Sequence, residues 1–468
     1  MIAPNVGRAR TSSAGLPSYA AQVLDSVLVA NRGEIARRVI RTARRMGIRT
    51  VAVYSAADED LPYVREADHA VLLGPAPPAQ SYLDSAAILR AARESGASAI
   101  HPGYGFLAER ASFAREVIAA GLTWVGPSPE AIEQMGDKIR ARNLMAVAGV
   151  PVSPGSTEPV LDEDTAVAEA KRIGYPVMVK AAGGGGGIGM SAATGEAELR
   201  AAFATARSRA ERFFGQPDIL IERYVARARH VEVQILGLAD GRVIALGERD
   251  CSVQRRHQKV AEETPSPGVG PALRERMLAA AVRAGEAVGY QGAGTVECLV
   301  DAEAGDFIFL EMNTRLQVEH PVTELVTGID LVEQQFLIAA GQDISFDPGA
   351  VPARGHAIEL RVYAEDPVRF LPGPGRITEW AEPSGDGIRV DAGYAAGNTV
   401  TPFYDPLLAK LCAYGVSRAE ALTRARDAVA AFRIAGPKTN LAFHADLLAS
   451  PEFASGDYDT SLVARLRP

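Results

Sequence analysis

Apolar and amphipathic segments alternate along the N-terminal part of the chain. Short apolar runs predict strands at residues 26–30, 50–55, 70–73, 99–101 and 123–126, and amphipathic runs predict helices at residues 33–46, 85–95 and 111–120. Strands that alternate with helices are typical of an open parallel sheet. We therefore predict that the chain begins with an open parallel α/β domain.

The pattern of apolar positions changes beyond residue 150. Residues 151–159 contain several prolines and are expected to form a linker. A small α+β unit is predicted next, with helices at residues 166–173 and 196–211 and strands at residues 177–181 and 219–222. The remainder is predicted to be mixed α+β without an internal repeat, with strands at residues 231–236 and 243–246 and helices at residues 272–288 and 418–432.

Two apolar strands flank a polar turn at residues 301–306, which predicts a hairpin. Glu297 and Glu311 would then face each other, with Cβ atoms roughly 5 Å apart, and Asn313 would share their face. Two unpaired carboxylates on a half-buried sheet carry a large desolvation cost, which a divalent cation such as Mg²⁺ removes. The alternative is an exposed strand with incidental glutamates, but the polar residues that continue at every second position up to Glu319 favour a metal–phosphate site.

An unbroken run of glycines, residues 183–187, follows a predicted strand that ends near Lys180. The backbone N–H groups of Gly184, Gly185 and Gly186 can approach phosphate oxygens because no Cβ stands in the way. The spacing matches neither the Rossmann fingerprint nor the P-loop. A plain flexible loop is the alternative, and Lys180 favours a mobile lid over phosphate groups.

Two strand ends carry weaker signals. Residues 219–225 could offer backbone groups to an adenine ring, with Glu222 accepting from its amino group, and an ordinary edge strand fits equally well. Residues 101–106 follow a predicted parallel strand at its carboxyl end, where open α/β sheets form their ligand crevices. A structural turn is the equal alternative there.

The segment at residues 248–263 is crowded with charged and amide side chains. Gln254, His257 and Lys259 are mixed hydrogen-bonding types, which favours an anion-binding wall over a solvated loop. The histidines in this half of the chain lack the spacing of zinc ligands. We therefore expect polar contacts from them, not metal binding.

The composition is that of a soluble globular protein with two or three subdomains. Of the 468 residues, 47% are hydrophobic, and no apolar run is long enough to span a bilayer. The net charge of −8 gives no basic footprint for nucleic acid. Three widely spaced cysteines (Cys251, Cys298 and Cys412) fit neither a disulfide framework nor a metal cluster, so a cytoplasmic location is expected.

Lysine is rare among the 49 basic residues of this arginine-rich chain. Each lysine is therefore a candidate position for a compact ammonium where a planar guanidinium would not serve. The six lysines are Lys138, Lys171, Lys180, Lys259, Lys410 and Lys438. Residues 1–25 are rich in alanine, serine and proline, and we expect a flexible extension there, with organelle targeting as the alternative.

Four motifs together resemble biotin carboxylase, the ATP-dependent component of acyl-CoA carboxylases, and the resemblance runs from Val27 nearly to the C-terminus. The motifs are Val29-Ala-Asn-Arg-Gly-Glu-Ile-Ala36, His101-Pro-Gly-Tyr-Gly-Phe-Leu107, Arg249-Asp-Cys-Ser-Val-Gln-Arg-Arg-His-Gln-Lys259 and Glu311-Met-Asn-Thr-Arg-Leu-Gln-Val-Glu-His320. The resemblance implies an ATP-grasp fold. Its N-terminal open parallel α/β domain would occupy residues 26–135, the ATP-grasp domain residues 136–345 with a glycine-loop lid at about residues 153–225, and a C-terminal mixed α+β domain residues 346–468.

The resemblance also implies the residues of the site. ATP-binding positions would be Lys138, Lys180, Gly184, Gly185, Gly186, Glu222, Val225, His230, Gln254, His257, Glu297 and Glu311. Two Mg²⁺ or Mn²⁺ ions would be held at Glu297, Glu311 and Asn313, which agrees with the hairpin argument. Bicarbonate would be held by Lys259, Arg315, Gln317 and the backbone N–H of Val318. The catalytic residues would be Glu319, Arg361, Arg315 and Lys259, and biotin would be approached by Tyr104 and Arg361.

The implied chemistry explains this set of residues. Glu319 would take the proton of bicarbonate as it attacks the γ-phosphate of ATP, which gives carboxyphosphate and ADP. Carboxyphosphate then releases CO₂, and the released phosphate deprotonates biotin at N1. Arg361 would stabilise the resulting enolate oxygen, and closure of the lid would keep water out.

One departure from the family pattern lies in the glycine loop. The family usually has Arg or Lys just before Gly-Met and often Arg after it, whereas this chain has Ile188 and Ser191. Two cationic contacts to phosphate or lid are therefore missing. We expect weaker ATP binding or altered lid closure, with the reaction retained.

The resemblance sets expectations for partners. No Met-Lys-Met biotinylation sequence is present, so the biotin carboxyl carrier protein and the carboxyltransferase of an acetyl-CoA or other acyl-CoA carboxylase, as in fatty acid biosynthesis, are expected as separate chains. A homodimer is expected, without nucleic-acid or membrane partners. One alternative is another ATP-grasp ligase that forms a different acyl phosphate, which leaves Arg315 to Glu319 with Arg361 unexplained. The other is a regulatory homologue that has lost catalysis, for which Ile188 is the only support.

Overall fold

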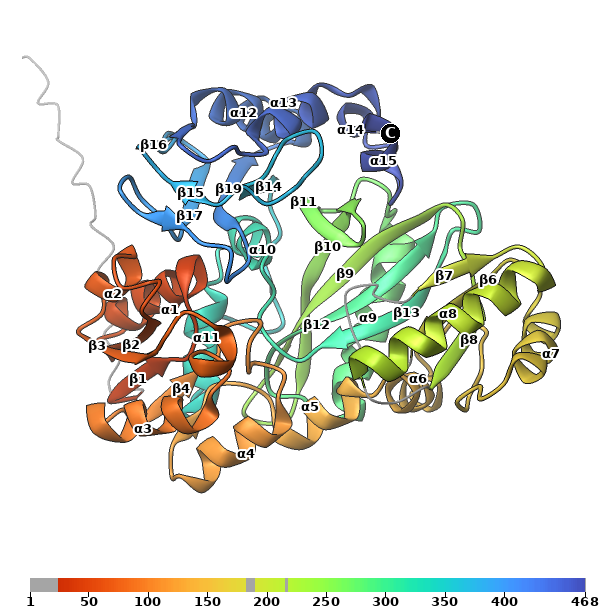
Figure 1. Cartoon of the computed structure of the whole chain (residues 1–468), viewed down its shortest axis with the longest axis horizontal. Helices are drawn as coiled ribbons and strands as arrows, with labels where there is room; N and C mark the ends of the chain where they lie inside the picture. The colour runs from red at the N-terminus through yellow and green to blue at the C-terminus, as the bar shows by residue number, and fades with distance from the viewer. Residues whose placement is uncertain (1–23, 182–189, 215–217, 468) are drawn as a thin grey trace, which may run out of the picture.

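The computed structural model describes residues 24–181, 190–214 and 218–467. Five parallel strands form an open sheet near the N-terminus, in the order β3–β2–β1–β4–β5 (Figure 1). The strands are β1 (Ser26–Val29), β2 (Arg49–Ser55), β3 (His69–Gly74), β4 (Ala99–His101) and β5 (Thr123–Trp124). The helices of this region are α1 (Gly33–Arg45), α2 (Pro62–Glu66), α3 (Ser85–Ser95), α4 (Ala111–Ala119) and α5 (Pro129–Gly136), with a 3₁₀ helix at Pro78–Gln80. The predicted open parallel α/β domain is confirmed.

An eight-stranded antiparallel sheet forms the centre of the molecule, in the order β13–β12–β9–β10–β11–β14–β19–β17. Its strands are β9 (Ala228–Gly237), β10 (Val243–Arg255), β11 (Gln258–Thr264), β12 (Gly292–Asp301), β13 (Asp306–Asn313), β14 (His356–Tyr363), β17 (Ile388–Ala392) and β19 (Leu407–Gly415). Two short strand pairs accompany it, β15 (Gly375–Arg376) with β18 (Thr399–Val400) and β16 (Glu379–Ala381) with β20 (Arg433–Ala435). The segment predicted as an anion-binding wall or a loop thus contributes to the β10–β11 hairpin of this sheet.

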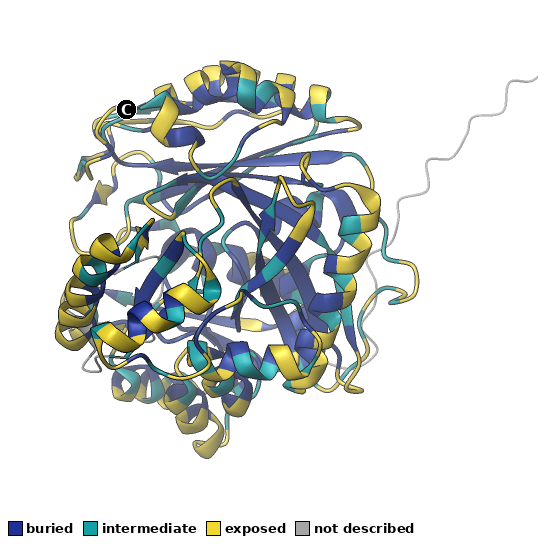
Figure 2. Cartoon of the chain, turned by 90° about the vertical axis from the view of Figure 1, so that its right-hand side faces the viewer, coloured by how far each residue is buried: buried dark blue, intermediate teal, exposed yellow. Residues whose placement is uncertain are grey.

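Helices cover both faces of the large sheet. Its apolar face is covered by α9 (Pro271–Ala287), α12 (Arg418–Ala431), α13 (Leu441–Ala449), α14 (Pro451–Ser455) and α15 (Leu462–Leu466). The opposite face is covered by α10 (His320–Thr327) and α11 (Leu331–Ala339). Apolar side chains of α12 and α13 pack with those of β11, β14 and β19 in one core cluster, and those of α9 pack with β9 and β12 in another. The strands are mostly buried, whereas the outward faces of the helices are exposed (Figure 2).

A smaller three-stranded sheet forms a unit of its own, seen at the right of Figure 1. Its strands β6 (Val177–Ala181), β7 (Ser191–Ala193) and β8 (Ile219–Arg223) pack against α7 (Glu163–Ile173) and α8 (Glu196–Phe214), and α6 (Lys138–Val147) precedes it. The expected linker at residues 151–159 is not free, because Val152 pairs with Phe309 of the large sheet and Gly155 with Glu222 of the small one. Among the described residues, no helix has both the length and the apolar character needed to span a bilayer.

Candidate active site

The predicted hairpin places its two glutamates directly opposite each other. Strands β12 and β13 pair with Glu297 opposite Glu311 and with Asn313 opposite Thr295. On its other edge β12 pairs with β9, which brings Glu232 opposite Glu297. Three carboxylates therefore lie on adjacent strands, and the sequence predicted two of them.

Lys259 is the central cation of this face of the sheet. Its Nζ donates to Glu232 Oε2 at 2.5 Å, to Glu297 Oε1 at 2.8 Å and to Glu319 Oε1 at 2.8 Å. Burial would lower the pKa of Lys259, but these carboxylates outweigh burial and raise the pKa well above its usual value. The ammonium is therefore charged at neutral pH, and it joins the predicted metal residues to the predicted general base.

The segment from Arg315 to Glu319 is irregular and connects β13 to α10. Arg315 Nη2 donates to Asn313 Oδ1 at 2.8 Å, and Arg315 Nη1 donates to Gln317 Oε1 at 2.7 Å. Gln317 Nε2 in turn donates to Glu297 Oε1 at 3.0 Å. The polar side chains of this segment therefore converge on the hairpin, although the segment itself does not continue the strand.

Glu319 lies between two cations. Its Oε1 accepts from Lys259, and its Oε2 accepts from Arg361 Nη2 at 2.9 Å. Burial would raise the pKa of Glu319, but Lys259 and Arg361 outweigh burial and hold the pKa well below its usual range. Glu319 is therefore ionised at neutral pH, as a general base has to be. Arg361 Nε also donates to Glu262 Oε1 at 2.7 Å, and burial raises the pKa of Glu262 to about 7.

Tyr104 approaches this group from the N-terminal domain. Its hydroxyl donates to Glu34 Oε1, and Glu34 Oε2 lies 3.1 Å from Lys410 Nζ. Burial raises the pKa of Tyr104 well above its usual value, Glu34 adds to this effect, and Arg361 opposes it. The two predicted biotin-facing residues are thus close enough to influence each other.

The predicted phosphate lysines lie on the side of the small sheet. Lys180 Nζ donates to Glu222 Oε2 at 2.5 Å, so the predicted adenine-contacting carboxylate is paired with a lysine in this structure. Lys138 is the first residue of α6, and its pKa is lowered by burial, with Glu311 acting in the opposite direction. Val225 is half-buried in the connection between β8 and β9.

The predicted nucleotide-pocket residues on β9 and β10 contact each other. His230 Nε2 lies 2.9 Å from Glu297 Oε2, and Gln254 Nε2 lies 2.6 Å from His230 Nδ1. His257 lies at the exposed turn between β10 and β11, where its φ is +69°. His320 is buried, and its Nδ1 lies 2.7 Å from a backbone carbonyl, as expected of a structural histidine.

A divalent cation fits the carboxylates of the hairpin. Within residues 24–181, 190–214 and 218–467, no side chain donates a hydrogen bond to Glu311. Burial raises the pKa of Glu311, and the neighbouring Glu297 raises it further. A half-buried carboxylate without such a donor, directly opposite a second carboxylate, suits Mg²⁺. Glu297 also lies close to His230 and Glu232, whose ligand atoms come within 4.8 Å of its own.

The glycine run, predicted to cover the phosphates, is part of a segment outside the described residues. Gly184, Gly185, Gly186 and Ile188 lie outside the described residues. Ser191, the other departure from the family pattern, is the first residue of β7.

The sequence predictions did not identify four polar residues of the site, which are Glu232, Arg249, Cys251 and Glu262. Glu232 pairs with Lys259 and with Arg249 Nε at 2.6 Å, and Glu262 holds Arg361. Cys251 is buried with its Sγ 3.6 Å from Glu319 Oε1. The available signal was spacing, because Glu232 follows His230 by two residues and Cys251 follows Arg249 by two, so each pair shares a face of its strand.

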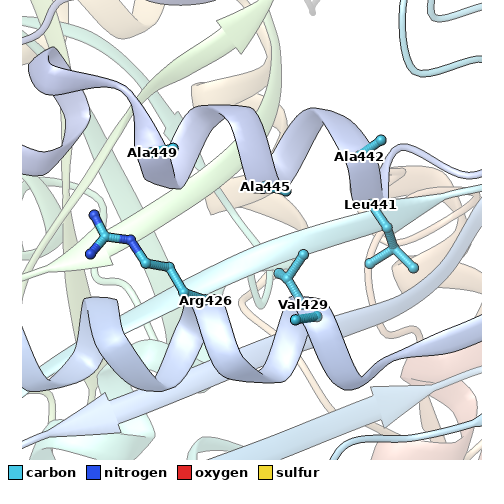
Figure 3. Close-up of a pocket in the computed structure, with 7 residues that line it drawn as sticks. Arg426, Val429, Leu441, Ala442, Ala445 and Ala449 are labelled. Carbon is cyan, nitrogen blue, oxygen red and sulfur yellow. The ribbon is translucent and has the colours of Figure 1, made fainter.

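A cavity of about 290 Å³ lies elsewhere, between α12 and α13 (Figure 3). Its lining is mostly small and apolar: Arg426, Val429, Ala430, Leu441, Ala442, Ala445 and Ala449. Arg426 is the one charged residue of the lining, and its guanidinium donates to the Leu448 carbonyl. This cavity holds no group that could transfer a proton or bind a metal.

Comparisons with known proteins decide the family. Residues 23–132 match the biotin carboxylase N-terminal domain, residues 137–346 match the carbamoyl-phosphate synthase L chain ATP-binding domain, and residues 359–465 match the biotin carboxylase C-terminal domain. The biotin carboxylase of Halalkalibacterium halodurans is 52% identical over 437 residues, which are 93% of this chain and 96% of that relative. The chain belongs to the biotin carboxylase family.

Solved biotin carboxylase structures share the fold. The biotin carboxylase–β-γ-ATP complex from Campylobacter jejuni superposes with a TM-score of 0.92 at 43% identity, over 94% of this chain and 99% of that one. The biotin carboxylase domain dimer of the Hydrogenobacter thermophilus 2-oxoglutarate carboxylase, solved with MgADP, ADP and bicarbonate, gives a TM-score of 0.91 at 43% identity, over 95% and 98% of the two chains. The predicted ATP-grasp fold is confirmed.

Proposed function

We propose that this biotin carboxylase homologue uses ATP and bicarbonate to carboxylate biotin on a carrier protein, the first half-reaction of a biotin-dependent carboxylase. The observation that carries the proposal is the position of Glu319, which accepts from Lys259 at 2.8 Å and from Arg361 at 2.9 Å. A carboxylate held between the proposed bicarbonate-binding lysine and the proposed biotin-facing arginine can accept the proton of bicarbonate close to the point where biotin is carboxylated.

The residues divide the chemistry between them. Lys259, Arg315 and Gln317 orient bicarbonate, and Glu319 accepts its proton as a bicarbonate oxygen attacks the γ-phosphate of ATP. The bond to the β-phosphate bridging oxygen breaks, which gives carboxyphosphate and ADP. Carboxyphosphate releases CO₂, the phosphate takes the N1 proton of biotin, and N1 attacks CO₂ while Arg361 neutralises the ureido oxygen.

The remaining polar residues serve the nucleotide. Mg²⁺ held by Glu297, Glu311 and Asn313 would neutralise phosphate charge. Lys138 and Lys180 lie on the same side and supply compact positive charge for the phosphates. Glu222 and Val225 would contact the adenine. The rest of the nucleotide pocket would include His230, Gln254 and His257, and the glycine loop would close over the phosphates.

We propose the same division of the chain as the sequence suggests: residues 26–135, 136–345 and 346–468, with the lid at about residues 153–225 and an extension at residues 1–25. The separate core of the small sheet supports a lid that moves as a unit. The dimer of the Hydrogenobacter thermophilus domain supports a homodimer. Carrier and carboxyltransferase would be separate chains of an acyl-CoA carboxylase, such as that of fatty acid biosynthesis, in the cytoplasm.

The proposal is tested by ADP formation by the purified chain with ATP and Mg²⁺. We expect hydrolysis that requires bicarbonate and rises with free biotin. Hydrolysis that ignores bicarbonate would indicate a different ATP-grasp substrate. ATP binding without any turnover would indicate a regulatory homologue.

A further inference from the structure

Lys410 is a buried lysine that the mechanism above leaves without a role. It lies on β19, and its side chain is 0% exposed. The two other lysines without a role, Lys171 and Lys438, are 63% and 70% exposed and form surface ion pairs. Burying an ammonium costs several kcal/mol unless its partners compensate, so the partners of Lys410 are informative.

The Lys410 ammonium contacts the proposed bicarbonate-binding segment and, through Glu34, the proposed biotin-facing residue Tyr104. Its Nζ donates to the Val318 carbonyl at 2.9 Å and lies 3.1 Å from Glu34 Oε2. The other oxygen of Glu34 accepts from the Tyr104 hydroxyl. One charged group therefore links the bicarbonate-binding segment to the residue that approaches biotin.

Other charges around Lys410 keep it ionised. Burial would lower the pKa of Lys410, but Glu34, Glu359 and Asp391 outweigh burial and raise it. An ammonium can donate in several directions from one small volume, whereas a guanidinium is a larger planar fork. This explains why an arginine-rich chain has a lysine here.

The Val318 carbonyl is a sensitive point of the backbone. It belongs to the peptide bond between Val318 and Glu319. A donor that fixes this carbonyl therefore also fixes the backbone nitrogen of Glu319, the proposed general base. The segment from Arg315 to Glu319 is irregular and has no strand partner to set its position. A side-chain anchor therefore has to supply the rigidity that a catalytic constellation needs.

We propose that Lys410 is a positioning residue that holds the Val318 backbone and, through Glu34, the Tyr104 side chain in fixed relation to each other. This inference rests on the proposed function. Lys410 itself need not touch bicarbonate or biotin. Its loss would therefore change how well these two substrates are held and leave the ATP subsite unaffected.

The test compares three variants in the assay of bicarbonate-dependent ADP formation. Lys410→Met should raise KM for bicarbonate and for biotin by about tenfold each, the value of one charged hydrogen bond, with KM for ATP unchanged. Glu34→Gln keeps the ammonium on Val318, so it should raise KM for biotin about fivefold and leave KM for bicarbonate unchanged. The exposed Lys438→Met is the matched control and should behave as wild type.

The double variant Glu34→Gln/Lys410→Met separates positioning from charge burial. It removes both charges, so folding should be retained even where Lys410→Met alone leaves a buried carboxylate unpaired. We expect its KM for bicarbonate to stay raised, because the Val318 carbonyl still lacks its donor. A wild-type KM for bicarbonate in the double variant would overturn the inference.

Two further outcomes are decisive. If neither Lys410 variant folds, Glu34→Gln still tests the biotin arm, and an unchanged KM for biotin there would overturn the inference. If wild-type protein forms no ADP in response to bicarbonate, the proposed function fails first. The two failures are therefore distinguishable.

Discussion

Two cations keep Glu319 ionised, but they also reduce its basicity. Lys259 and Arg361 hold its pKa well below the usual range, so the carboxylate is ready to accept a proton at neutral pH. The same cations make it a weak base while they point at it. Bicarbonate would relieve this by taking over part of the charge of Lys259, which couples substrate binding to activation of the base.

Replacing Glu319 by glutamine keeps the shape and removes the base. We expect Glu319→Gln to lower kcat of bicarbonate-dependent ADP formation by about 10²–10⁴-fold, the usual contribution of general base catalysis. ATP affinity should change little, because the contacts of Glu319 lie on the bicarbonate side. Glu286→Gln, an exposed change on α9, is the matched control. Activity of Glu319→Gln within tenfold of wild type would rule out this role.

Individual site residues were predictable where they follow a simple spacing. Glu297, Glu311 and Asn313 could be placed because alternation along a hairpin fixes their face. Spacing alone places Glu232 on the same face as His230. The pairing of Glu232 with Lys259 and of Glu262 with Arg361 could not be predicted, because these partners come from other strands. A buried carboxylate is identified by its partner, and partners distant in sequence are not visible in a local pattern.

The β10–β11 hairpin is an element whose strands also depend on partners distant in sequence. Its sequence is crowded with Arg, Asp, Gln and Lys, which are poor strand formers, so a loop was a fair alternative. In the structure Arg249 is fully buried and its guanidinium donates to Glu232, Gln234, Thr295 and Thr323. Side chains from neighbouring elements thus compensate for the low strand propensity, and no local rule could have shown this.

The last residue of β9, Gly237, packs so closely that it leaves no room for a side chain. A Cβ added at Gly237 would lie 1.9 Å from the Tyr290 carbonyl oxygen, which is backbone and cannot rotate away. We expect Gly237→Ala to lower the free energy of unfolding by about 1–3 kcal/mol through overpacking, seen as a lower thermal midpoint.

A matched glycine provides the control. Gly136 has nothing within 4 Å of an added Cβ and ends α5, so Gly136→Ala should be neutral or slightly stabilising. Equal thermal midpoints for the two variants would contradict the packing at Gly237.

At the scale of the whole molecule, one sheet joins two regions that the sequence suggests are separate. Strand β11 pairs with β14, with Glu262 opposite Glu359, so the eight-stranded sheet continues into the C-terminal region. Lys259 and Arg361 therefore lie on neighbouring strands. The sequence predicted positions for most strands up to β13, but not for β11 or for the strands beyond residue 346. Pairing between residues about a hundred positions apart was not predictable either, because period-two patterns carry no information about the partner strand.

Glu263 stabilises the pairing of β11 with β14 on the face of the sheet opposite to Glu262. It accepts from His356 at 2.6 Å, Arg418 at 2.7 Å and Tyr458 at 2.6 Å. Burial would raise the pKa of Glu263, but His356 and Arg418 outweigh burial and lower it to about 2. Because the folded-state pKa is depressed, its stabilisation is present above about pH 4.5 and is lost as the pH falls towards 2.

Glu263→Gln tests this stabilisation. The shift corresponds to about 3 kcal/mol of stability at pH 7. We expect a lower thermal midpoint for the variant at pH 7, and a difference from wild type that shrinks as the pH falls from 5 towards 3. Glu286→Gln should follow wild type throughout. A difference that is the same at pH 7 and pH 3 would show that Glu263 stabilises by packing alone.

Transfer of labelled carbon from bicarbonate to biotin is the direct test of biotin carboxylation by this chain. We expect the purified chain to form labelled carboxybiotin from ¹³C-bicarbonate and free biotin only when ATP and Mg²⁺ are both present, and we expect Glu319→Gln to form none. Formation of ADP without label in biotin, under conditions where bicarbonate stimulates hydrolysis, would contradict this expectation.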